Sequence, residues 1–395
     1  MSLALADSRW WGILGVFALE PHFQDMAAIL AAVEAVGNGL NPYVPNPFDL
    51  LGRPHSYGPW WLWLDVLGLT TDDNWWLGSL LVLVSLVTAT SILAPKDRRT
   101  AFITVLLLMG TPLMLAFERA NNDLIIFLMF VGVAALLDRP GRSNVVWSAF
   151  ILLVAAALKF YPLAAYPVLL LSRDRPFGFK VLIGLLLASC FVLVIWLQEF
   201  IWAYQEVARP RSTDAVGVEA FGNMWNFPVG NRWALSIGWL VGGLSTTLVA
   251  WKAWPRPCSG KPERGWLPLP FALGGMVWCS CYLAGSNYLY RWVLLFLPAA
   301  IWIKELQDPV WGKLARAQLH LMIVFGVGWI AWKALISDAT LVDPVIGSAF
   351  WLVVGTLHGL ALVLTVFIGI RLIVGVGHEL GVTAGILSRR VWDSK

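Results

Sequence analysis

An aspartate near the start of the chain is the residue best placed to act as a base. Asp25 follows the first apolar run and opens a stretch, residues 26–36, whose apolar positions recur at three and four spacing. Gly37 and Gly39 interrupt that pattern, so the stretch predicts a helix too short to cross a bilayer. A carboxylate held at the start of such a helix suits a general base that accepts the proton of a hydroxyl group.

Other interpretations of this first polar segment stay open. Aspartate is a common helix cap, so Asp25 could serve the helix alone. Glu20 and His22 are the nearest competing acid–base groups.

The turn FERANND, residues 117–123, places two acids, a cation and two amides between two apolar runs. Its polar members are Glu118, Arg119, Asn121, Asn122 and Asp123. This mixture suits an anionic or hydroxyl-rich ligand. The simpler interpretation is that Asp123 caps the next helix and that Glu118 pairs with Arg119.

Two more turns each bring a cation between apolar runs. In ALKFYPL, residues 157–163, Lys159 stands beside Tyr161, and a lysine at a membrane edge is costly without an anionic partner. That partner could be a ligand or a protein carboxylate, Glu118 or Asp123. In GSNYLYRW, residues 285–292, Arg291 accompanies Asn287 and Tyr288, although it could simply reach toward the membrane surface.

Membrane helices are the elements that must position these turns. Hydrophobic residues make up 58% of the 395 residues, charged residues make up 13%, and the mean hydropathy is +0.71. These values are typical of polytopic membrane proteins and exclude a soluble enzyme. We expect an all-α fold with about twelve transmembrane helices in a single transmembrane domain, residues 1–395. The first apolar run, residues 10–19, is interpreted as an uncleaved first helix.

The distribution of basic residues predicts the orientation. Six connections are rich in lysine and arginine, and the positive-inside rule places them in the cytoplasm. Their basic residues are Lys96, Arg98 and Arg99; Arg139 and Arg142; Arg173, Arg175 and Lys180; Lys252, Arg256, Lys261 and Arg264; Lys304, Lys313 and Arg316; and Arg371, Arg389, Arg390 and Lys395. This sorting accounts for the net charge of +4, which therefore does not indicate nucleic-acid binding.

The polar turns then lie on the outer face, together with two longer segments. Residues 20–73 form a first outer loop, in which residues 57–69 are too short to span and predict a re-entrant or interfacial helix. Residues 200–232 form a large outer loop that suits contact with an acceptor or service as a mobile lid. The four cysteines lack the spacing of a zinc site or a disulfide framework, so we interpret them as structural. We expect no metal and no cofactor.

Transfer of a sugar from a lipid phosphate carrier would use this set of groups. Arg119, Lys159 and Arg291 would bind the phosphate and stabilise its developing charge, while Asp25 takes the proton of the attacking hydroxyl. The residues expected to contact the sugar or the acceptor are Glu20, His22, Tyr57, Asn121, Asn122, Asp123, Tyr161, Asn287 and Tyr288.

The ordered set of motifs resembles the C-type glycosyltransferases, and most closely the polyprenyl-phosphate-mannose-dependent α-mannosyltransferases. The matching elements after Asp25 are GLNPY at 39–43, YGP at 57–59, RANND at 119–123, KFYPL at 159–163 and SNYLYR at 286–291. The resemblance implies that Asp25 is the catalytic base and that transfer is metal-independent, with inversion at the sugar. Gly58 stands where the family usually has a second proline, and RANND is one residue longer than the family's element.

The resemblance also implies where the reaction takes place and with which partners. The partners are a polyprenyl-phosphate sugar, a lipid or glycan acceptor and the membrane lipids. The protein lies in a bacterial plasma membrane, and its site faces the periplasm.

Two other classes of protein stay open. A transporter or flippase of a lipid-linked sugar would also be polytopic, but its polar sites would lie near the midplane in repeated halves. A non-catalytic subunit of a membrane complex would use the aromatic residues for helix packing.

Overall fold

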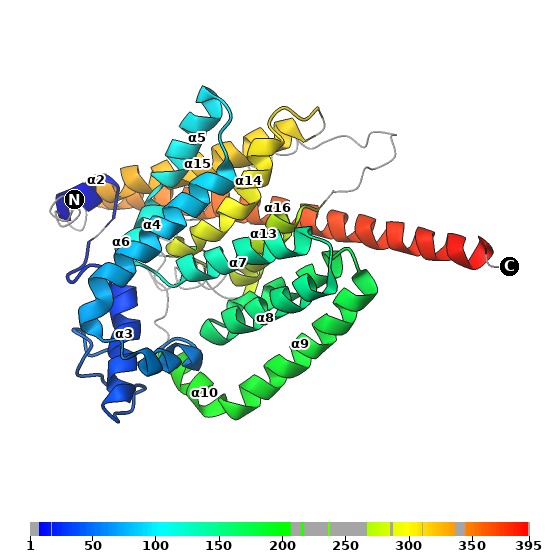
Figure 1. The fold of residues 1–395 in the computed structure, drawn as a ribbon. Coiled ribbons are helices and arrows are strands. Elements are labelled where there is room, and N and C mark those ends of the chain that lie inside the picture. Colours follow the sequence, from blue (N-terminus) through cyan, green and yellow to red (C-terminus); the bar gives the residue numbers. More distant parts are fainter. Residues whose placement is uncertain are drawn as a thin grey trace.

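The part of the chain that the structure describes consists of helices joined by turns and irregular segments, with two paired two-residue strands (Figure 1). The structure is a computed structural model. It describes residues 8–16, 18–206, 215–216, 236–237, 267–284, 287–309, 311–335 and 344–393.

The first outer segment folds into short helices. It contains α3 (Gln24–Gly37), η1 (Pro59–Leu67) and η2 (Thr71–Asp73). Helix α3 covers the stretch predicted to be helical and ends at Gly37, and Ile29, Val33 and Trp61 form a small apolar core between α3 and η1. Nine of the fourteen residues of α3 are buried, so most of this helix faces protein. The preceding apolar run gives only α2 (Ser8–Ile13), which is too short to cross a bilayer.

Three helices are long and apolar enough to cross a membrane. They lie within Thr71–Leu93, Arg175–Ile195 and Leu352–Val376, and correspond to α4 (Asn74–Leu93), α9 (Arg175–Ile195) and part of α16 (Pro344–Asp393). A fourth span would combine α5 (Arg98–Leu108) with α6 (Thr111–Arg119), which meet at a bend of 55°. These spans were found among the described residues, and the larger number of about twelve stays a prediction.

Apolar side chains on the long helices face outward. On α9, Leu187 is 66% exposed, Phe191 67% and Val194 72%, with nothing in the described part of the chain covering them. Such a surface is stable only against an apolar solvent. Together with the long apolar helices, it shows a helical membrane protein.

The remaining helices of the described part complete the bundle. They are α7 (Asp123–Asp138), α8 (Arg142–Leu158), η3 (Tyr161–Leu171), α10 (Leu197–Glu206), α13 (Leu269–Ala284), η5 (Leu289–Leu295), α14 (Phe296–Lys304) and α15 (Gly312–Leu335). Helix α6 packs against η5, and α13 packs against η3. At the centre, the ring of Trp292 stacks on Phe325 at 4.2 Å between centroids and meets Trp278 edge-on. This packing brings together turns that are far apart in the sequence.

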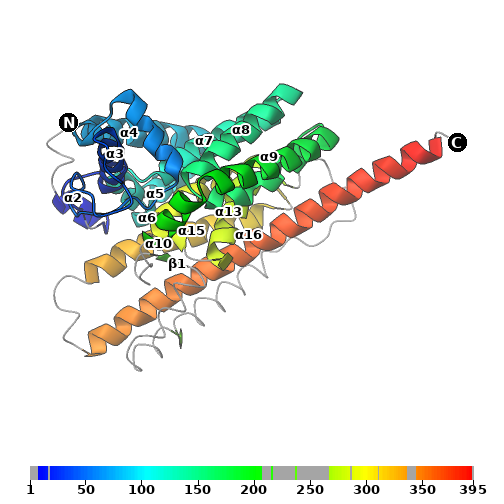
Figure 2. The same cartoon turned by 90° about the horizontal axis from the view of Figure 1, so that it is seen from below.

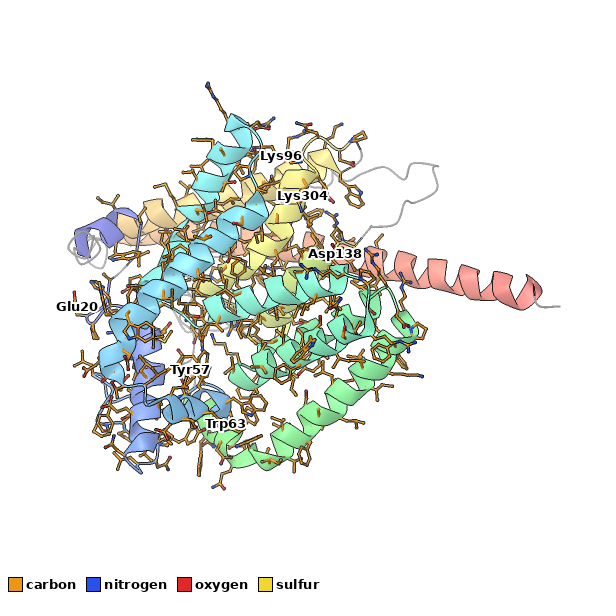
Figure 3. All side chains as sticks on the ribbon, in the orientation of Figure 1. Glu20, Tyr57, Trp63, Lys96, Asp138 and Lys304 are labelled. Atoms are coloured by element: carbon orange, nitrogen blue, oxygen red, sulfur yellow. The ribbon has the colours of Figure 1, made fainter. Side chains whose placement is uncertain are left out.

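Basic connections and the first outer segment lie at opposite ends of the bundle. Lys96 and Lys304 mark one end, and Glu20, Tyr57 and Trp63 mark the other (Figure 3). Helices α3 and α10 lie at the second end (Figure 1). Trp63, exposed by 61%, stacks on Trp60, and Trp196 meets both rings edge-on. Exposed tryptophans of this kind suit a membrane interface.

Helix α16 is a single 50-residue helix whose C-terminal part projects beyond the other helices in both views (Figure 2). Arg371, assigned above to a basic connection, instead lies in the middle of this helix. It is 2% exposed and forms a two-pronged ion pair with Glu305, at 2.8 and 2.5 Å. Its guanidinium also lies 4.5 Å from the ring centroids of Phe271 and Trp311. These contacts fix α16 to the end of α14.

Breaking this ion pair from one side is expected to destabilise the fold. Glu305→Gln leaves the Arg371 charge buried without its partner, which costs about 3–5 kcal/mol. The double variant Glu305→Gln with Arg371→Met removes the charge and should recover most of that loss. Thermal unfolding in detergent measures both. Arg142→Gln is the matched control, because its pair with Asp174 is exposed at the surface and should contribute less than about 1 kcal/mol.

Candidate functional site

Four segments that are distant in the sequence meet at the end of the bundle marked by Tyr57. They are the start of α3, the α6–α7 turn, the α8–η3 turn and the start of η5. Asn121 joins the first two, because its side-chain amide donates to the Asp25 carboxylate at 2.5 Å. The Asn121 carbonyl oxygen accepts the backbone N–H of Asp123 at 2.8 Å. One amide therefore connects the expected base to the next acid of the site.

Asp123 is the centre of a buried charge cluster. It accepts a hydrogen bond and an ion pair from Lys159 and a hydrogen bond of 2.6 Å from the Tyr161 hydroxyl. Its second carboxylate oxygen lies 3.7 Å from Nε of Arg291. The Asp123 side chain is fully buried. Lys159 and Arg291 therefore both lie against this single carboxylate.

Aromatic rings surround the two cations. The Lys159 ammonium lies 5.4–5.7 Å from the ring centroids of Tyr57, Tyr161 and Tyr290. The Arg291 guanidinium lies 4.7 Å from Tyr161 and 5.6 Å from Tyr288. Tyr288 and Tyr290 stack with their centroids 5.2 Å apart. Rings at these distances stabilise the cations and offer faces and hydroxyls to a ligand.

Local chain geometry places Lys159 and Tyr57 together. The N–H of Gly58 and the indole N–H of Trp61 both donate to the carbonyl of Leu158, at 3.0 and 3.2 Å. A Cβ atom at position 58 would lie 1.9 Å from the carbonyl oxygen of Ala157. The YGP element therefore lies directly against the end of α8, and only glycine allows this approach.

The structure decides between several of the roles left open by the sequence. The N-cap position of α3 is Phe23, with no side-chain cap, and Asp25 accepts from Asn121 instead. Asp123 likewise does not occupy an N-cap position, since Asn122 precedes it there. Asp123 is the protein carboxylate that pairs with Lys159.

The structure also shows the partners of Arg119 and the position of Arg291. Glu118 and Arg119 form an ion pair of 2.9 Å, as the simpler interpretation predicted. Arg291 does not extend to the surface: its side chain is 16% exposed and lies against Asp123 and the tyrosine rings.

The remaining predicted site residues differ in their positions. Glu20 has a side chain that is 76% exposed and lies 3.8 Å from the buried ring of His22, which packs toward Trp75. Among the described residues, neither Glu20 nor His22 forms a hydrogen bond with Asp25 or Asp123. The backbone of Asn287 lies in β2 (Asn287–Tyr288), which pairs with β1 (Ala215–Val216), while its side chain lies outside what the structure describes. Apart from Phe200 to Glu206 and β1, the 200–232 loop also lies outside the described residues.

Asn122 is fully buried, and neither its amide nitrogen nor its carbonyl oxygen has a hydrogen-bond partner among the described residues. A buried amide without partners costs free energy. Asn122 lies between Asn121 and Asp123 in the chain. It is therefore the residue of the α6–α7 turn with the most unused hydrogen-bonding capacity.

Arg53 was not singled out from the sequence, although it lies beside the expected base. It pairs with Asp49 at 2.8 Å and donates at 3.1 Å to the backbone carbonyl of Gln24, which precedes Asp25. Burial raises the pKa of the Tyr57 hydroxyl, and the charge of Asp25 raises it further while Arg53 opposes this. The sequence signal was weak, because Arg53 lies in an irregular stretch with no periodic pattern.

His55 makes the stability of the first outer segment dependent on pH. Its ring is 2% exposed, lies edge-on between Tyr43 and Tyr57, and has Nε2 at 3.3 Å from the carbonyl oxygen of Gly58. Burial lowers the pKa of His55 to about 4. The unfolded chain, with an ordinary histidine pKa of about 6.5, therefore binds the proton first as the pH falls.

Stability is consequently expected to fall between about pH 6.5 and pH 4, by up to roughly 3 kcal/mol. Thermal unfolding at pH 7.5 and pH 4.5 measures the change for the native chain and for His55→Gln. Other groups titrate in both proteins, so the difference between them isolates His55. An equal acid sensitivity of the two proteins would contradict this assignment.

The fold and the site together define a helical membrane protein with a buried, charged and aromatic cluster at one end of its bundle. No group of three or more His, Cys, Asp and Glu side chains suited to a metal ion occurs in the described part of the chain. No protein-family model, curated protein or solved structure matches the chain.

Proposed function

We propose that this protein is a membrane glycosyltransferase that moves a hexose, mannose in the first instance, from a polyprenyl-phosphate donor to a hydroxyl of a lipid or glycan acceptor. The site faces the outer side of a bacterial plasma membrane, in a C-type fold of about twelve transmembrane helices. Asp25 is the base, Lys159 and Arg291 hold the phosphate, and the reaction uses no cofactor.

The observation that supports this proposal most directly is the connection of Asp25 to the cations. The Asn121 side chain bonds to Asp25 on one side and to the backbone of Asp123 on the other. Asp123 in turn contacts both Lys159 and Arg291. A base and a phosphate-binding pair on one short chain of contacts is what displacement at a sugar phosphate requires.

The chemistry follows from these positions. The acceptor O–H gives its proton to the Asp25 carboxylate while its oxygen forms a bond to the anomeric carbon. The bond between that carbon and the phosphate oxygen breaks, and the leaving polyprenyl phosphate keeps the electron pair. This single displacement inverts the anomeric configuration, and Asp25 then loses its proton to water.

The two cations suit this leaving group. The donor is a phosphodiester with one negative charge, which Lys159 and Arg291 attract. When the leaving group gains a second negative charge, a bidentate guanidinium stabilises it strongly. Arg119 is a weaker candidate for phosphate binding than the sequence predicted, because Glu118 already pairs with it.

The neutral polar groups supply hydrogen bonds to a sugar or an acceptor. Tyr57, Tyr161 and Tyr288 surround the cations, and the side chain of Asn122 has no partner among the described residues. A hydroxyl-rich ligand would satisfy these groups. Glu20 and His22 lie at the edge of this arrangement and suit contact with the acceptor.

Transfer of label from the lipid donor tests the proposal. The purified chain in nanodiscs receives radiolabelled polyprenyl-phosphate-mannose together with lipid and glycan extracts as acceptors, in the presence of a metal chelator. We expect label in a new product and none when GDP-mannose replaces the lipid donor. If no lipid-phosphate sugar gives a labelled product, the protein is better explained as a non-catalytic subunit of a membrane complex. Movement of intact donor across the membrane of vesicles, without a new product, would favour a transporter.

A further inference from the structure

Asp123 occupies the place where an anionic ligand would meet both cations. Its oxygen Oδ1 accepts from Lys159 and Tyr161, whereas Oδ2 has no hydrogen bond among the described residues and lies 3.7 Å from Arg291. The side chain is therefore held firmly on the lysine side and loosely on the arginine side. Bidentate pairing with a guanidinium requires shorter contacts than this.

We propose that Asp123 is a resident counter-ion, which the phosphate group of the lipid donor displaces from Arg291 and Lys159. This inference rests on the proposed function and adds a step to it. A phosphate offers several acceptor oxygens, so it can form the bidentate contact with Arg291 that Asp123 does not form. Before the donor binds, the Asp123 carboxylate offsets part of the cost of burying the two cations.

The consequence for affinity can be measured with a prenyl phosphate alone. Asp123→Asn keeps the size of the side chain and removes the competing charge. We expect farnesyl phosphate to bind this variant at least about tenfold more tightly than the native chain, as measured by titration calorimetry in nanodiscs of uncharged lipid. Farnesol, which lacks the phosphate, should bind both proteins equally.

Asp49→Asn is the matched control. Asp49 is also buried and paired with an arginine of the same end of the molecule, but it lies outside the Lys159–Arg291 cluster. Its replacement should leave the dissociation constant for farnesyl phosphate within about threefold of the native value. Equal tightening by both variants would mean a general field effect and would overturn the proposal.

A weaker or unchanged affinity of Asp123→Asn would overturn the proposal as well, because the carboxylate would then not compete with the ligand. The proposed glycosyltransferase function would still stand in that case if the native chain binds farnesyl phosphate and Arg291→Gln does not. Absence of any phosphate-dependent binding to the native chain or to its variants would reject both.

The variant also removes the carboxylate that lies against two buried cations, so its folding is part of the test. If Asp123→Asn aggregates when purified alone, we expect farnesyl phosphate in the purification buffer to restore a monodisperse protein, whereas farnesol should not. Failure of farnesyl phosphate to restore the variant would contradict the exchange of one anion for the other.

Discussion

Replacing Asp25 with asparagine is expected to abolish sugar transfer while binding of farnesyl phosphate stays nearly unchanged. The amide keeps the size of the side chain but cannot accept the proton of the attacking hydroxyl. Loss of a general base lowers turnover by about 10²–10⁴-fold. The proposed phosphate-binding residues, Lys159 and Arg291, form their ion pairs with Asp123 rather than with Asp25. The effect should therefore fall on the turnover number rather than on the affinity for the prenyl phosphate.

The same acid-to-amide change at Asp72 is the matched control. Asp72 belongs to the same outer segment, in η2, but its side chain is exposed and no described contact joins it to the charge cluster. Asp72→Asn should transfer sugar at the native rate. Glu20→Gln and His22→Gln distinguish the competing bases. If Asp25→Asn keeps native turnover and one of these two variants loses it, the assignment of the base is wrong.

The sequence predicted the polar turns better than it predicted what they contact. The turns at 118–123, 159–162 and 287–291 were recognised because each interrupts an apolar run, and such an interruption can be identified in the linear sequence alone. Asp123 was only one of three possible partners for Lys159, since a partner 36 positions away is determined by helix packing. Arg53 escaped notice for the same reason.

Helix lengths were the weakest part of the sequence prediction. The apolar run at 10–19 gives only the short α2, and the helix at 57–69 is a 3₁₀ segment, Pro59–Leu67, packed on α3. Hydropathy identifies segments that prefer an apolar environment, but it does not distinguish lipid from protein interior. Ile29 and Val33 show the difference, since both are fully buried by neighbouring helices.

Gly58→Ala is expected to destabilise the first outer segment and to lower transfer together. The new methyl group would lie 1.9 Å from the Ala157 carbonyl oxygen, 2.8 Å from its carbonyl carbon and 2.9 Å from that of Leu158. These are backbone atoms at the end of α8, so no side-chain rotation relieves the overlap. Overpacking typically costs about 1–3 kcal/mol, and the hydrogen bond from the N–H of Gly58 to Leu158 would be strained as well.

The effect on activity follows because Lys159 is the next residue after Leu158. Separating η1 from α8 moves Tyr57 away from the Lys159 ammonium and changes the phosphate-binding pair, and misplacement by about 1 Å can cost roughly 10²-fold in rate. Thermal unfolding and label transfer measure the two losses. Gly132→Ala is the matched control, since a Cβ there meets no atom within 4 Å and the residue lies inside α7. If Gly58→Ala is as stable as the native chain, η1 can move away from α8 without cost. The contact of Gly58 with the end of α8 would then not position Lys159.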